Sequence, residues 1–137
     1  MGNRATIAVP TAKHMIYLQW NGGLGSVRAF TDEALRRNGG QINESLIYEL
    51  YGAIRDFFSF AGEKNRGRDG LSLYIVDKAS KCEGDNGHYS ITPKGKLDTS
   101  EARLIEDFVY TAKSYNNITG FFQKMESMQL KADWDAA

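Results

Sequence analysis

Alternating apolar and polar positions mark the beginning of the chain. Residues 5–9 and residues 15–20 each place apolar side chains at every second position, a pattern typical of half-buried strands. The glycine-rich run 21–25 ends the second strand. Helical spacing then follows over 26–38, where Ser26 is a suitable cap and two glycines stop the helix. The chain is therefore predicted to begin strand, strand, helix.

One more helix and two more strands are predicted in the middle of the chain. Apolar positions three and four residues apart indicate a helix that begins at Asn43 or Ser45 and buries a broad face. The polar, glycine-rich segment 62–70 is expected to be an exposed loop. Alternation over 71–77 predicts a strand, and 88–92 is expected to pair back on that strand as a hairpin.

Helical spacing returns after Asp98, and Asn116 with Asn117 separates this helix from a last one. The order is then ββααββαα, and its short connections favour antiparallel neighbours. We expect an α+β fold with an antiparallel sheet of about four strands packed with helices. Residues 1–97 would form the sheet and helix core, and 98–137 a helical extension of the same domain. The extension packs either on a second copy of the chain or on its own sheet.

Composition and charge narrow the possible partners. The 137 residues suit one globular domain, and 17 Lys and Arg balance 17 Asp and Glu. A DNA or RNA polymer is therefore not expected as a partner, because no overall basic field would hold its backbone. No apolar run approaches the ~18 residues of a membrane span, and the first residues lack a signal-peptide core, so we expect a cytoplasmic protein. Gly2 followed by Thr6 also fits an N-myristoylation signature, without a polybasic partner signal.

Residues that could carry catalysis or bind a metal are few. Neither His14 nor His88 lies at a metal-ligand spacing with Cys82 or a carboxylate, so we predict no metal site and no cofactor. Cys82 follows the basic Lys81, which could lower the pKa of its thiol, but no general base is evident beside it. An ordinary surface or half-buried thiol is the alternative. We assign no catalytic residue and do not expect an enzyme.

The junction between the second strand and the first helix is the most informative local feature. Unpaired N–H groups and the positive end of the helix dipole would meet there, which favours an anion. Trp20 could stack on a base, Asn21 could bond a purine edge or a ribose hydroxyl, and Arg28 could reach a phosphate. The alternative is structural: Gly22 and Gly23 shape the turn, Trp20 fills the core, and Arg28 pairs with the carboxylate four residues later.

A second polar group lies in the other half of the chain. Asn86 and Tyr89, with Lys94 or Arg103 nearby, could line a pocket on the sheet, although Asn-Gly at a hairpin is commonly a turn device. Arg55 either stacks on the tyrosine four residues before it at the rim or is simply solvated. The candidate ligand-binding residues are Trp20, Asn21, Gly22, Gly23, Arg28, Arg55, Asn86, Tyr89, Lys94 and Arg103.

Three short segments resemble a known family. Met1-Gly2-Asn3-Arg4-Ala5, Tyr17-Leu18-Gln19-Trp20-Asn21-Gly22-Gly23 and Ser26-Val27-Arg28-Ala29-Phe30 are similar to small phage and prophage proteins of the anti-Thoeris family, Thoeris anti-defence protein 1. The similarity is specific over about thirty residues and looser afterwards. It implies a homodimer or larger homo-oligomer in the bacterial host cytoplasm. Such a protein binds glyco-cyclic ADP-ribose, made by a TIR-domain defence enzyme, and sequesters it without cleavage.

The resemblance also bears on individual positions. Gln19 and Leu24 stand where family members often carry a histidine and a basic residue, which removes two potential phosphate donors. In the family, the arginines that clamp the diphosphate lie later in the chain. In this sequence Arg103 is the best candidate and Arg55 the second. Some members also bind cyclic di- or trinucleotides at a separate site. The alternative function is a protein-directed inhibitor that blocks a bacterial immune component through its surface, with the C-terminal helices as binding element.

Overall fold

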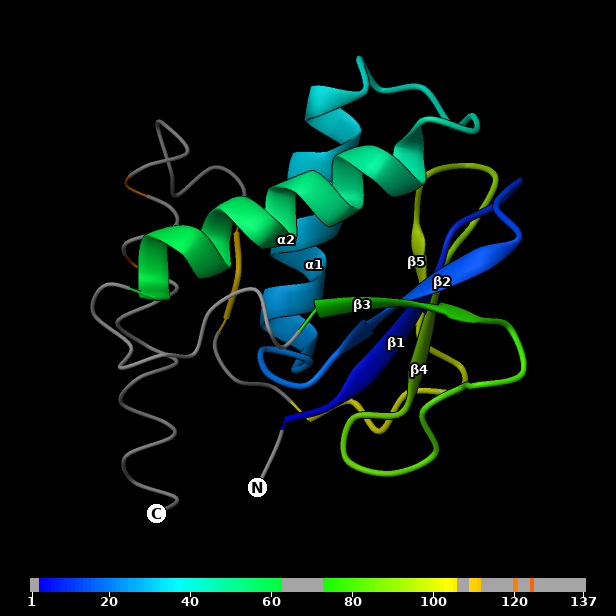
Figure 1. Ribbon diagram of the computed structural model, residues 1–137, viewed down its shortest axis with the longest axis vertical. Helices are drawn as coiled ribbons and strands as arrows, with labels where there is room; N and C mark the ends of the chain where they lie inside the picture. The colour runs from blue at the N-terminus through cyan, green and yellow to red at the C-terminus, as the bar shows by residue number, and fades with distance from the viewer. Residues whose placement is uncertain (1–2, 63–72, 106–108, 112–119, 121–123, 125–137) are drawn as a thin grey trace.

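The computed structural model describes residues 3–62, 73–105, 109–111, 120 and 124. In these ranges the chain forms a sheet with helices packed against it (Figure 1). The element order is ββααβββ. The elements are β1 (Ala5–Ala8), β2 (His14–Leu18), α1 (Leu24–Arg37), α2 (Leu46–Gly62), β3 (Leu73–Asp77), β4 (His88–Ile91) and β5 (Leu97–Asp98).

The five strands form one mixed sheet in the order β3-β2-β1-β4-β5. The central strand β1 is antiparallel to β2 and parallel to β4, so that Ile7 lies beside Ile16 on one side and Tyr89 on the other. The pairs β2 with β3 and β4 with β5 are antiparallel. The parallel pair of β1 and β4 thus joins the antiparallel strands β3, β2 and β1 to the antiparallel pair β4 and β5.

The prediction of a fully antiparallel sheet is wrong. The segment 88–92 does not pair with 71–77 but lies next to β1, with Thr6 beside His88. Burial gives the physical reason. Thr6 is fully buried and His88 is 4% exposed, as expected of central strands covered on both faces, whereas Ile75 of β3 is 51% exposed at the sheet edge. The parallel pairing is possible because two helices and two strands intervene between β1 and β4.

The predicted ββααββαα order is also wrong after Asp98. Residues 99–105 and 109–111 contain no helix. The Asp98 carboxylate accepts the backbone N–H of Ser100 in a turn, and Ala102 then forms a β-bridge with Gly87. This backbone pairing with the start of β4 competes with the helix that the apolar spacing predicts. The last predicted helix falls outside the described residues except for Gly120 and Lys124.

The two helices agree with the sequence prediction, and their ends show why. Arg36 and Arg37 lie in the last turn of α1, where positive charge complements the helix dipole. Gly39 and Gly40 follow with φ of +66° and +78°, in the left-handed region that ends helices. Before α2, the N–H of Ser45 donates to the side-chain oxygen of Asn43 at 3.1 Å. No helix within the described ranges is both long and apolar enough to cross a membrane.

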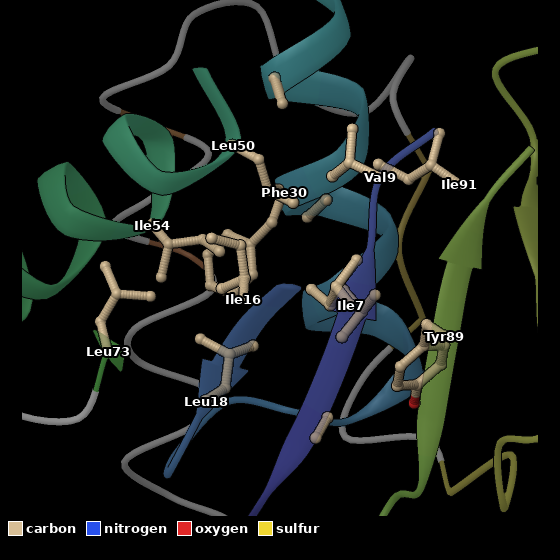
Figure 2. Packing of buried hydrophobic residues seen from close by; sticks show 14 of the residues in the cluster. Ile7, Val9, Ile16, Leu18, Phe30, Leu50, Ile54, Leu73, Tyr89 and Ile91 are labelled. Atoms are coloured by element: carbon tan, nitrogen blue, oxygen red, sulfur yellow. The ribbon is translucent and has the colours of Figure 1, made fainter. Parts of the chain in front are cut away.

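The hydrophobic core lies between the helices and one face of the sheet (Figure 2). The rings of Phe30 on α1 and Phe57 on α2 are 5.6 Å apart, and both are fully buried above the sheet. Burial of such a side chain contributes about 1.5–3 kcal/mol to stability. The strands contribute the alternating residues Ala5, Ile7, Val9, Ile16, Leu18, Leu73, Tyr89 and Ile91.

Candidate ligand-binding site

The junction between β2 and α1 is closed by the rest of the chain. The N–H of Gly22 donates to the carbonyl of Asn3 at 2.8 Å, and the N–H of Leu24 donates to the carbonyl of Ile105 at 3.0 Å. Both N–H groups belong to the junction at which the sequence predicts an anion to bind. Because both already bond carbonyl oxygens and the whole segment 21–27 is buried, a ligand would have to displace the chain to reach them.

Packing explains why Gly22 and Tyr89, two of the predicted ligand-binding residues, occupy their positions. A Cβ at Gly22 would lie 2.6 Å from the Asn3 carbonyl oxygen and 2.7 Å from the Ala5 Cβ, so only glycine fits. The Tyr89 ring is fully buried in the core, and its hydroxyl donates to the Gly22 carbonyl at 3.0 Å. Trp20 is half-buried and packs against the same core. The junction has a structural role.

Asn86 and Arg103 come together at a second corner. Asn86 is buried, and its amide donates to the side chain of Asn3 and to the Arg4 carbonyl. The N–H of Arg103 donates to the Asn86 carbonyl at 3.0 Å, and its guanidinium donates to the Glu83 carbonyl at 3.2 Å. These bonds tie the segment before β4 to the N-terminus and to the residues after β5. Asn86 is thereby part of a structural turn.

The remaining predicted cations lie on other elements. Arg55 is exposed on α2, with its Nε 3.9 Å from the Asp56 carboxylate. Lys94 is exposed in the turn between β4 and β5, and Arg28 is exposed on α1. Among the predicted site residues, Arg28 lines a cleft between α1 and the turn that carries Lys94.

This cleft has a volume of about 500 Å³ and opens between α1 and the turn before β5. Three separate regions of the chain supply its walls, and the region on α1 is far in sequence from the other two. The lining residues are Arg28, Thr31 and Asp32 from α1, Gly95, Lys96 and Leu97 from the turn and β5, and Tyr110 with Thr111.

Local structure holds the two main walls in place. Thr31 and Asp32 lie three and four residues after Arg28, so both are neighbours of Arg28 on the surface of α1. In the opposite wall, the N–H of Lys96 donates to the Thr92 hydroxyl at 3.1 Å, and its carbonyl accepts the Thr92 N–H at 2.7 Å. The short turn therefore fixes the backbone of Lys96 beside the helix.

The described lining residues carry two positive charges and one negative charge. Arg28 and Lys96 contribute the positive charges from different elements, and Asp32 contributes the carboxylate. Partial burial of that carboxyl raises its pKa, and a hydrogen bond from the Tyr110 hydroxyl opposes the rise. Asp32 as a whole residue is still exposed, so solvent moderates this effect. The arrangement suits a ligand that is anionic and also has hydroxyl groups.

A buried hydroxyl in the helix wall lacks a partner. Thr31 is 3% exposed, and its Oγ1 has no hydrogen-bond partner among the residues that the structure describes. Leaving such a group unsatisfied costs about 1–3 kcal/mol. Because the oxygen has almost no accessible surface, a ligand in the cleft would supply the missing bond only if the side chain turned toward it.

Sequence reasoning found Arg28 and missed most of the other lining residues. Thr31 and Asp32 share its helix face, so helical spacing was the signal that could have found them. Lys96 lies two residues after the predicted Lys94. Tyr110 lay in a segment that the apolar spacing assigned to a helix, and no local signal placed it beside α1.

A second polar cluster lies on the sheet face opposite the helices. His88 is hydrogen-bonded through Nδ1 to the Thr6 hydroxyl at 2.8 Å and through Nε2 to the Ser90 hydroxyl at 3.2 Å. The N–H of Cys82 donates to the same Thr6 oxygen at 3.0 Å, so a loop covers this strand pair. Burial, and then the charge of Lys81, lower the pKa of His88. Within the described ranges, no group of three or more His, Cys, Asp or Glu could hold a metal ion.

Comparisons with known proteins add no relative. The chain matches no protein-family model, no curated protein and no solved structure.

Proposed function

We propose that the protein binds a cyclic ADP-ribose-type nucleotide in the cleft between Arg28 and Lys96 and sequesters it without cleavage. In this hypothesis it is an anti-defence sponge that inhibits Thoeris immunity in the bacterial cytoplasm. The sequence resemblance motivates the choice of nucleotide. The observation that carries the binding is that Arg28 and Lys96 line one cleft from different elements, together with a tyrosine. A diphosphate would neutralise both cations at once.

The mechanism would be affinity alone. The guanidinium of Arg28 can form paired hydrogen bonds with phosphate oxygens, and the ammonium of Lys96 can approach them as a point charge. A volume of about 500 Å³ lies within the usual range of small-molecule sites. To outcompete a host receptor, the dissociation constant should be nanomolar or lower, which corresponds to about −12 kcal/mol.

The chemistry of the cleft favours holding the ligand over cleaving it. No histidine or cysteine is present among its described lining residues. The carboxylate of Asp32 is hydrogen-bonded to Tyr110, and the described lining offers no second carboxylate to complete an acid and base pair. Sequestration therefore stands ahead of hydrolysis as the proposed activity.

Self-association is part of this proposal. Edge strand β3 exposes Tyr74 on one face and Ile75 on the other, at 52% and 51%. An edge strand with exposed apolar side chains can pair with another chain, and a second copy would give a homodimer or larger homo-oligomer. A separate site for cyclic di- or trinucleotides stays a prediction of the resemblance.

One observation favours the alternative of a protein-directed inhibitor. A second cleft of about 330 Å³ between the β1–β2 turn and α2 has the exposed Tyr48 and Ile75 in its wall. Exposed apolar side chains beside a groove are typical of protein interfaces. Recovery of a host protein with the full chain, combined with no nucleotide uptake, would favour this reading.

Calorimetry with cyclic ADP-ribose tests the nucleotide proposal. We expect the full chain to bind the probe, and heating to release it unchanged, as detected by mass spectrometry. The double variant R28Q/K96Q should weaken binding at least a hundredfold, whereas R55Q, on an exposed arginine outside the cleft, should bind as the parent does. Absence of binding, or release of a hydrolysed product, would overturn the proposal.

A further inference from the structure

The carboxylate of Asp32 is unexpected in a cleft that binds only an anion. Arg28 precedes it by one helical turn, and both residues line the same wall. A carboxylate near bound phosphate would repel it and weaken the binding that the two cations provide. The same carboxylate is a strong acceptor for hydroxyl groups. Its presence therefore points to a ligand that carries hydroxyl donors next to its phosphate.

We infer that the cleft selects a phosphorylated pentose with a free 2-hydroxyl group. Asp32 accepts a hydrogen bond from this hydroxyl, while Arg28 and Lys96 bind the phosphate. This inference rests on the proposed function, because it names the part of the nucleotide that the cleft recognises. A vicinal diol can donate two hydrogen bonds to one carboxylate. A deoxypentose or a bare phosphate offers fewer donors or none, so the cleft would discriminate against both.

The contacts of Asp32 leave room for such a ligand. The Tyr110 hydroxyl donates to this carboxylate. An ionised carboxylate has about four lone-pair positions, so one donor does not saturate it. Tyr110 also helps to hold the carboxylate at the cleft wall, which would reduce the entropy lost when a ligand binds.

Thr31 supplies an independent observation. Thr31 lines the cleft, it is 3% exposed as a residue, and its hydroxyl is buried without a partner within the described part of the chain. If the side chain turns toward the cleft, this hydroxyl, which can both donate and accept, would bond a pentose hydroxyl next to the one on Asp32. The two neighbouring helix residues would then recognise two neighbouring hydroxyl groups.

The experiment compares three small probes on the full chain. Ribose 5-phosphate, 2-deoxyribose 5-phosphate and inorganic phosphate are titrated while binding is followed by NMR chemical shifts. We expect ribose 5-phosphate to bind about tenfold more tightly than its deoxy analogue. In D32N this preference should fall to about twofold or less, because a neutral amide accepts hydroxyl protons more weakly. E44Q, which removes one carboxylate charge outside this cleft, should keep the preference.

Thr31→Val separates a binding role from a structural one. Valine replaces the unpaired hydroxyl with a methyl of similar volume, so the unliganded protein should melt at the same temperature or higher. Ribose 5-phosphate should bind about threefold or more weakly to T31V, and T31S should recover most of the affinity. A fall in melting temperature without loss of affinity would show that the hydroxyl serves the fold alone.

The outcomes of these tests are distinguishable from failure of the proposed function. Equal binding of ribose and deoxyribose phosphates to the parent, absence of binding by both, or a preference for ribose 5-phosphate that is unchanged in D32N would overturn the pentose inference. Cyclic ADP-ribose binding would still stand in the first case. Discrimination between the two sugars without cyclic ADP-ribose binding would support the inference and overturn the nucleotide proposal.

Discussion

The hydroxyl of Tyr89 on β4 donates a hydrogen bond to the carbonyl of Gly22 at 3.0 Å, across 67 residues of sequence. The ring fills the core beside Ile7, and its polar end holds the turn that leads into α1. One side chain thus packs the sheet and fixes the start of the helix that carries Arg28.

Tyr89→Phe should destabilise the fold without removing the ring. The substitution leaves the Gly22 carbonyl buried without this donor, at a cost of about 1–3 kcal/mol. A loss of this size lowers the melting temperature by several degrees in a domain of this length. Urea unfolding of the parent and Y89F measures the change. An unchanged midpoint would mean that this bond contributes nothing to stability.

Two glycine substitutions should have opposite signs. G22A places a Cβ 2.6 Å from the Asn3 carbonyl oxygen, so the backbone must shift, and we expect a loss of about 2–4 kcal/mol. G52A is the matched control in α2, where the nearest atom to the added Cβ is Arg37 Nη1 at 3.8 Å. There alanine should stabilise the helix by up to about 1 kcal/mol. Thermal unfolding of both variants tests the contrast, and equal effects would contradict it.

Glu33 should stabilise the packing of the two helices above acidic pH. It is 7% exposed and accepts bonds from the guanidinium groups of Arg36 and Arg37, and Arg37 also bonds Asp56 of α2 at 2.8 Å. Burial alone would raise the pKa of Glu33, but the bonds from the two arginines outweigh it and lower the pKa below 4.5. E33Q should cost about 1–2 kcal/mol at neutral pH.

The pH dependence of that loss has a definite sign. Because the folded-state pKa of Glu33 is lowered, its contribution is complete above pH 4.5 and is lost as pH falls through the folded pKa. Urea unfolding from pH 7 to pH 3 should therefore show the parent and E33Q converging in acid. E83Q, on an exposed carboxylate, is the control and should follow the parent. A constant difference at all pH values would refute the role of the charge.

His88 should make the fold less stable in weak acid. Burial, and then Lys81, lower its pKa below 6.5, so protonation of the folded state is unfavourable. Its contribution is present above pH 6.5 and declines as pH falls through the lowered value, because the unfolded chain binds the proton more readily. H88Q should lose less stability than the parent between pH 7.5 and pH 5. The exposed His14, changed to Gln, should leave the parent's pH profile intact.

The sequence predicted the elements better than their pairing. The helices α1 and α2 were correct because apolar spacing and the Gly39-Gly40 stop act locally. The parallel pair of β1 and β4 was missed because it depends on contacts such as Thr6 beside His88, which no local pattern encodes. From sequence, a polar threonine and a polar histidine are expected at exposed positions. Here both are buried, and a hydrogen bond between their side chains satisfies them.

The candidate site was predicted only in part, for the same reason. Arg28 was identified because it follows a turn that suggested an anion site, although Gly22 and Leu24 there already bond the chain. The cleft instead forms where a turn with Lys96 and a distant segment with Tyr110 meet α1. Such a convergence follows from the tertiary fold, and composition or spacing alone does not specify it.

The place of β1 in the sheet has a consequence for biosynthesis. Its parallel neighbour begins at His88, 82 residues after Thr6, so a ribosome must make most of the chain before the central strand is flanked on both sides. Until then the nascent protein presents one bare edge of β1, a surface on which unfinished copies can aggregate. Slow, late closure of the sheet is thus built into the order in which the strands are translated.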